Sequence, residues 1–292
     1  MDIQKRRRSF WSCVAPILTY YLCQIVAYVI MAIVYSVKLM KTVDLNQTYE
    51  KMMNSVMEQL MQKIDLISYE SMLLAAVIAI PILLRKFKKD NAARKLIGME
   101  EHFNAVPYKW YFIPIIMGVS AAIAGNNMIT MSGLEQSSEA FSQVNEVLTA
   151  GSFGLQILGV GILVPIVEEL LFRGLIYKRM GEMMPKVQAG IFSALVFGLL
   201  HANIVQGIYG FCIGVLMCLA YERFHSLISP ILMHVSANLI VVILSELNVG
   251  YQSLTMFYLV TMIMCVLLIA SVWMLEAYVR PLNPESDSEN EI

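Results

Sequence analysis

The feature that most constrains this chain is a series of long apolar blocks. Several run for about 20 residues with few charges, the length that an α-helix needs to cross ~30 Å of hydrocarbon. Hydrophobic residues make up 58% of the 292 residues and charged residues only 15%. A soluble domain of this size needs more charge to cover its surface. The sequence therefore predicts an all-α, polytopic transmembrane bundle.

We predict about eight spanning helices, with approximate bounds at 14–37, 67–84, 110–131, 154–172, 187–204, 205–222, 227–246 and 254–275. The first block is too long for the apolar region of a signal peptide, so we expect a retained membrane helix. The fourth, fifth and sixth blocks carry polar residues and have short connections. Their boundaries are therefore the ones that the sequence defines least.

Basic residues predict the orientation of the chain in its membrane. Lys and Arg gather in 5–8, 85–95 and 178–186, whereas the loops 38–66 and 132–153 contain few of them. The positive-inside rule then places both termini in the cytoplasm, and we expect the plasma membrane. No basic stripe alternates with aromatic residues, so we expect no nucleic-acid partner.

Three parts are predicted along the chain: N-terminal membrane helices in 1–149, a membrane core in 150–280, and an acidic disordered tail in 281–292. Apolar residues within 41–65 recur at helical spacing and predict an amphipathic helix outside the bilayer core. They are Met52, Met53, Val56, Leu60, Met61 and Ile64. In the sixth block, Gly207, Gly210 and Gly214 predict a helix that its neighbours approach closely.

Ionisable residues inside the apolar blocks are candidates for a functional site, because burying them in a membrane is costly. Glu169 and Arg173 are four residues apart, so they share a helix face and can form an ion pair. Glu168 points about 100° away from them. Its partner must therefore come from another helix.

Two further polar clusters lie in apolar blocks, one at His201 and one at His234 and Asn238, which share a helix face. With the two glutamates they could activate a water molecule and stabilise an oxyanion. They could also bind a divalent metal such as zinc, with Glu168, His201 and His234 as candidate ligands. No HExxH motif occurs, and no serine lies in GxSxG.

Three motifs carry a resemblance to a known family: EExxxR at 168–173, FxxxH at 197–201 and HxxxN at 234–238. Their order and spacing resemble the CPBP intramembrane proteases, which include CAAX-processing endopeptidases of the Rce1 type and Abi proteins. The resemblance covers about residues 150–245. It implies that Glu168, helped by His201, activates water, and that His234 and Asn238 stabilise the oxyanion. It also implies that Glu169 and Arg173 hold the site in place.

The expected function is therefore an intramembrane endopeptidase, with a peptide or lipidated protein as substrate and membrane lipid as its surroundings. The substrates would be membrane-associated or of the prenylated type. One alternative is a non-catalytic bacteriocin-immunity or scaffold protein of the same family. Another is a transporter or channel, in which Glu, His and Arg would relay ions. The predicted boundaries contain one conflict, because they place Glu168 and His201 at opposite sides of the membrane.

Overall fold

The computed structural model describes residues 9–42, 48–99, 106–134, 138–201 and 203–279, and within these ranges it contains helices and no β-strand. The predicted acidic tail, 281–292, lies outside the described residues. Long helices form because the apolar blocks must satisfy their backbone hydrogen bonds internally. They are α1 (Trp11–Met40), α3 (Ile64–Leu96), α4 (Phe112–Ser132), α10 (Ile204–Phe224), α11 (Ile228–Glu246) and α12 (Leu254–Tyr278).

One further helical run, Phe153–Gly181, is composite. It consists of α6 (Phe153–Gln156), the π-helical stretch η2 (Ile157–Leu163), α7 (Val164–Glu169), the π-helical stretch η3 (Leu170–Tyr177) and α8 (Lys178–Gly181). The shorter helices are α2 (Tyr49–Gln62), the 3-10 turn η1 (Tyr108–Tyr111), α5 (Glu139–Thr149) and α9 (Lys186–Leu199).

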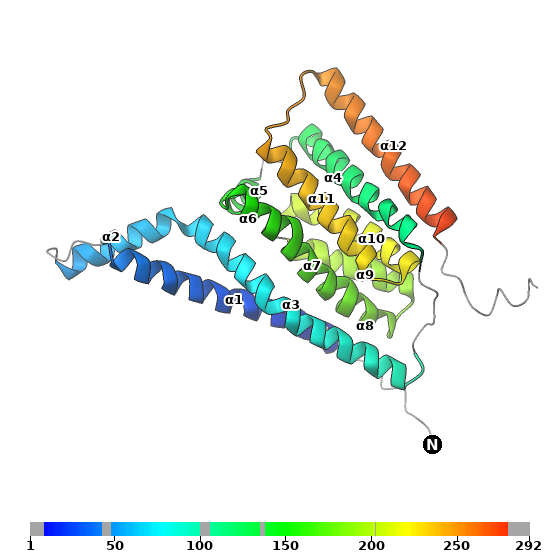
Figure 1. The fold of residues 1–292 in the computed structure, drawn as a ribbon, viewed down its shortest axis with the longest axis horizontal. Helices are drawn as coiled ribbons and strands as arrows, with labels where there is room; N and C mark the ends of the chain where they lie inside the picture. Colours follow the sequence, from blue (N-terminus) through cyan, green and yellow to red (C-terminus); the bar gives the residue numbers. More distant parts are fainter. Residues whose placement is uncertain (1–8, 43–47, 100–105, 135–137, 202, 280–292) are drawn as a thin grey trace, which may run out of the picture.

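The helices form an N-terminal hairpin and a bundle (Figure 1). In the hairpin, α1 packs along α3, and α2 joins them at the end that points away from the bundle. In the bundle, α11 packs against α4, η2, α7 and α10, while α9 packs against α10 and η3. The composite run and α11 therefore lie side by side, and they bring the EExxxR and HxxxN motifs together. The segment of the predicted amphipathic helix forms α2, and its place outside the bilayer core stays a prediction.

Seven helices are long and apolar enough to span a membrane, among the residues that the structure describes. The predicted C-terminal end of the fifth span, at residue 204, is wrong, because α9 ends at Leu199 and has only 14 residues. At 1.5 Å per residue it covers about 21 Å, less than the ~30 Å of hydrocarbon. The predicted fourth span is also wrong in its end, because the composite run continues past 172 to Gly181.

The expected close approach at the sixth block is confirmed. A methyl group on Gly207 would lie 3.2 Å from the backbone oxygen of Gly198 on α9. One on Gly214 would lie 3.1 Å from the side chain of Ala194 and 3.2 Å from that of Arg173. Small residues thus let α9 and α10 pack backbone to backbone, and they leave room for the arginine.

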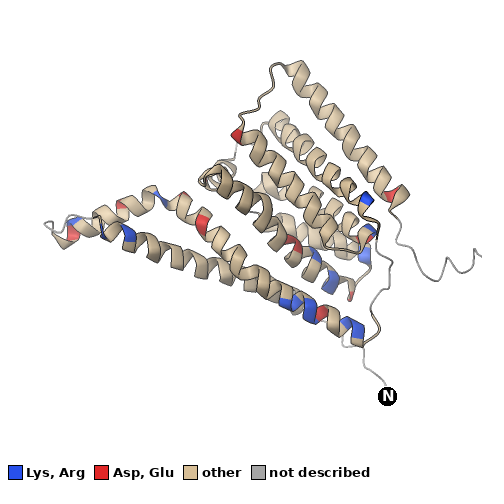
Figure 2. Cartoon of the chain, in the orientation of Figure 1, with Lys and Arg blue, Asp and Glu red and all other residues tan. Residues whose placement is uncertain are grey.

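Charged residues lie around α2, at the tip of the hairpin, and also gather at the other end of the molecule, where α3 and α8 end (Figure 2). Ion pairs there join separate elements: Asp90 to Arg179, Arg94 to Glu182, and Lys186 to Glu222. These positions match the basic segments that the positive-inside rule assigns to the cytoplasm. We therefore keep the cytoplasmic side as the prediction for this end of the bundle.

Candidate active site

Glu169 and Arg173 form the buried centre of the site. Arg173 Nη1 donates to Glu169 Oε1 at 2.9 Å, and both side chains are 0% exposed. Arg173 Nη2 donates to the backbone oxygen of Gly214 at 2.9 Å. The guanidinium also lies over the Phe197 ring, 4.8 Å from its centroid. The predicted ion pair is thus confirmed, and it links the composite run to α9 and α10.

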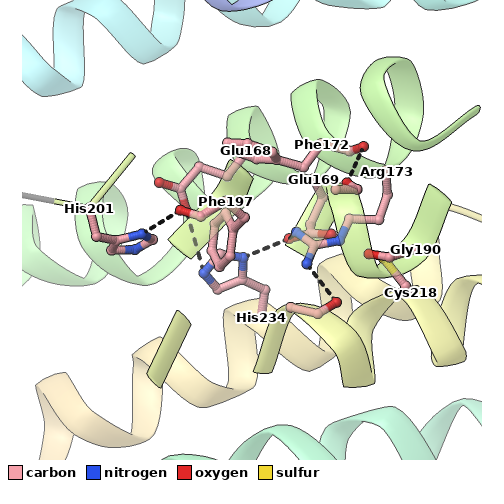
Figure 3. Close-up of polar contacts among 11 residues, drawn as sticks. Glu168, Glu169, Phe172, Arg173, Gly190, Phe197, His201, Cys218 and His234 are labelled. Atoms are coloured by element: carbon pink, nitrogen blue, oxygen red, sulfur yellow. Dashed lines mark hydrogen bonds and ion pairs between the residues drawn. The ribbon is translucent and has the colours of Figure 1, made fainter. Parts of the chain in front are cut away.

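His234 on α11 contacts both glutamates (Figure 3). Its Nδ1 lies 2.9 Å from Glu169 Oε1. Because an ionised carboxylate can only accept, Nδ1 donates and carries a proton. Its Nε2 lies 3.5 Å from Glu168 Oε2. The expectation that Glu168 finds its partner on another helix is therefore confirmed, and the partner is His234.

Glu168 is the more accessible of the two glutamates. Its side chain is 19% exposed, whereas that of Glu169 is fully buried. Arg173 neutralises Glu169, and no comparable cation is fixed on Glu168 among the contacts of the described residues. Glu168 can therefore meet a water molecule, while Glu169 orients the residues around it.

His201 follows the end of α9 and faces the same region (Figure 3). Its Nδ1 lies 2.8 Å from the backbone oxygen of Phe197. A carbonyl oxygen only accepts, so Nδ1 donates and Nε2 stays available as an acceptor. The Phe197 ring packs edge-on against both imidazoles, with centroids 4.8 Å from His201 and 5.8 Å from His234. Phe197 thus separates the two histidines and fixes their orientation.

Asn238 lies one helical turn beyond His234 on α11. Its Nδ2 donates to the backbone oxygen of Val160 at 2.8 Å, in the π-helical stretch η2. The amide therefore fastens α11 to the composite run in this structure. The family resemblance implies that Asn238 binds an oxyanion, and this role stays a prediction.

The structure removes the conflict over the depth of the site. Glu168 lies near the middle of Phe153–Gly181 rather than at the end of a span. His201 lies just after the short α9, which reaches only part of the way across. Glu168 and His201 therefore lie in the same region of the bundle (Figure 3). The conflict arose because both predicted boundaries were wrong.

The predicted zinc ligands fit a zinc ion only in part. Glu168 Oε2 and His234 Nε2 are 3.5 Å apart, which suits two ligands that each lie ~2 Å from one ion. Within the described part of the chain, no group of three or more His, Cys, Asp or Glu side chains is arranged to hold a metal. Glu168 and His234 thus fit a shared ion, whereas His201, the third predicted ligand, is not grouped with them in the described part of the chain. Zinc stays a prediction.

Some contacts at the site could not be predicted from the sequence. The backbone oxygens of Val160 and Gly214 serve as acceptors, and no side-chain pattern marks them. Ser193 donates to the backbone oxygen of Phe172 at 3.1 Å, and Ser236 to that of Met233 at 2.9 Å. Both hydroxyls near the motifs therefore have backbone partners.

Comparison with known proteins finds a similar family and a similar protein. Residues 150–240 match the family described as type II CAAX prenyl endopeptidase Rce1-like. The chain is also 26% identical over 174 residues to the "Putative membrane peptidase YdiL" of Bacillus subtilis (strain 168). That alignment covers 59% of this chain and 68% of the relative. No solved structure matches the chain significantly.

The helical membrane bundle with its buried Glu-Arg-His cluster is similar, over residues 150–240, to a family of membrane proteases. The resemblance to the CPBP family is confirmed, and the matched segment contains all the predicted site residues.

Proposed function

We propose that this protein is an intramembrane endopeptidase that cleaves peptide bonds of membrane-associated substrates with a water molecule activated by Glu168. The observation that carries the proposal is the pairing of Glu168 with His234, while His234 is itself held by Glu169. A carboxylate and an imidazole in contact can pass one proton between them. Lipidated proteins of the prenylated type are the proposed substrate class, because the matching family is described by that activity.

The charges of the site support this assignment. The positive charge of Arg173 balances the negative charge of Glu169. Glu168 and His234 are together neutral when they share one proton in addition to the proton on His234 Nδ1. Neutrality matters because an uncompensated charge is costly in a low-dielectric interior. In the reactive form Glu168 is a carboxylate and His234 an imidazolium, which places a base and a cation side by side.

The proposed reaction begins at Glu168. Glu168 takes a proton from water, whose oxygen bonds to the scissile carbonyl carbon. The carbonyl oxygen becomes an oxyanion. His234 and hydrogen-bond donors on the neighbouring helices stabilise it. The proton then passes to the amide nitrogen, the C–N bond breaks, and the two peptide fragments leave. His201 Nε2 can accept a hydrogen bond from the water or the substrate.

The test is cleavage of a membrane-peptide library by the purified protein, with Glu168→Gln beside the wild type. The amide keeps the shape of the side chain but cannot accept the proton, so we expect cleavage to fall at least ~100-fold. Exposed Glu146→Gln on α5 is the matched control and should cleave normally. Equal cleavage by Glu168→Gln and the wild type would refute the proposal.

A chelator arm addresses the predicted zinc. Loss of cleavage on chelation, with recovery on adding zinc, would assign a metal to Glu168 and His234. Cleavage that persists in chelator, and that still depends on Glu168, would assign the glutamate mechanism. Cleavage by neither protein would favour the alternative of a non-catalytic immunity or scaffold protein.

A further inference from the structure

A second polar cavity lies away from the proposed active site, where the end of α3 meets the composite run, α9 and α10. Its volume is about 330 Å³. Its lining includes the cations Arg94, Lys178 and Lys186 and the carboxylates Glu182 and Glu222. It lies at the charged end of the bundle, beyond the level of Glu168 along the same helical run.

The guanidinium of Arg94 marks the cavity as a binding site. Its Nε donates to Glu182 at 2.7 Å and its Nη1 to Asn91 at 3.0 Å. Its Nη2 is buried without a hydrogen-bond partner among the described residues. The Arg94 side chain is only 9% exposed. A buried donor without an acceptor is costly, so a ligand that supplies an oxygen would be favoured there.

Two other features favour an anion. Helix α9 begins at Lys186, on the cavity wall, and its N-cap Pro185 provides no side-chain cap. The first N–H groups and the dipole of a helix attract negative charge. The three cations and two carboxylates of the lining sum to one positive charge when His225 is neutral. A singly charged phosphodiester would neutralise the cavity.

We propose that this cavity binds the phosphodiester headgroup of an anionic membrane phospholipid. Arg94 Nη2 and Lys178 would hold the phosphate oxygens, and the α9 N-terminus would face them. The cavity is at the end of membrane-spanning helices, where lipid headgroups lie, and basic pockets between such helices suit anionic lipids. Bound lipid would contact α3 and α10 together, and so would fasten the N-terminal hairpin to the catalytic bundle.

The experiment measures thermal unfolding of the purified full-length protein in detergent, with added phosphatidylglycerol, phosphatidylcholine or inorganic phosphate. We expect phosphatidylglycerol to raise the melting temperature in a saturable manner, and phosphatidylcholine to have little effect. An equal shift with phosphatidylcholine would overturn the proposal. A shift with inorganic phosphate as large as with the lipid would assign a free phosphate ion and overturn the lipid as its source.

Two variants locate the site. Lys178→Gln should bind phosphatidylglycerol about 10-fold more weakly, the loss of one charge-assisted contact worth about 1.4 kcal/mol. Arg94→Lys keeps a cation beside Glu182 but removes Nη2, and it should weaken binding similarly without lowering the unliganded melting temperature much. Lys109→Gln, on the Trp110 ring outside the cavity, is the control. Unchanged lipid affinity in both cavity variants would refute the site.

Discussion

Replacing Arg173 by methionine tests whether the buried ion pair holds the site together. Met fills much of the volume but removes the charge, so Glu169 is left fully buried with only His234 as a partner. Removing one partner of a buried pair costs about 3–5 kcal/mol. The backbone oxygen of Gly214 also loses its donor. At roughly 2 °C per kcal/mol for a chain of this size, the melting temperature should fall by about 6–10 °C.

The assay is thermal unfolding in detergent, and a double variant makes it specific. Adding Glu169→Gln to Arg173→Met removes the unpaired carboxylate, so about 2 kcal/mol, or roughly 4 °C, should return. Arg223→Met is the control, because Arg223 pairs with Glu276 at side chains that are 32% and 40% exposed. It should cost less than about 1 kcal/mol. A double variant no more stable than Arg173→Met would refute the reasoning.

Two further predictions follow from the packing and the orientation. Gly198→Ala places a methyl group 2.5 Å from the backbone oxygen of Gly207, so stability should fall by about 1–3 kcal/mol and cleavage should fall with it, whereas Gly154→Ala has open space and should be neutral in both assays. In a cysteine-free background, Gly181→Cys and Gly250→Cys also have open space, and an impermeant thiol reagent on intact cells should label only the second. Labelling of Gly181→Cys alone would reverse the predicted orientation.

Much of the fold was predictable because a membrane imposes long apolar helices. The hydropathy of the blocks located every helix that the structure shows as long enough to span. The pairing of Glu169 with Arg173 was also predictable, since helical geometry places residues four apart on one face. The same geometry left Glu168 unpaired locally, which correctly pointed to a contact on another helix.

Helix ends at the site were not predictable from hydropathy. Polar residues interrupt the composite run at Glu168 and Glu169, yet the helix continues because the buried charges find partners. Arg173 donates to Glu169 and to the backbone oxygen of Gly214, and His234 donates to Glu169. The contacts of Asn238 were hidden for a related reason. Its acceptor is a backbone oxygen in a π-helical stretch, and side-chain spacing carries no information about such an atom.

The short α9 determines where His201 lies in the helical bundle. His201 and Asn203 follow Leu199, where α9 ends, and irregular backbone among membrane helices is tolerated only inside protein or beside water. Asn203 begins the next helix as the N-cap of α10, where its Oδ1 accepts from the backbone N–H of Gln206 at 2.8 Å. A longer α9 would instead have continued through His201 as regular helix. The shortness of α9 therefore leaves His201 in a turn that faces the same region as Glu168 (Figure 3), which supports the proposed role of Glu168 in activating water.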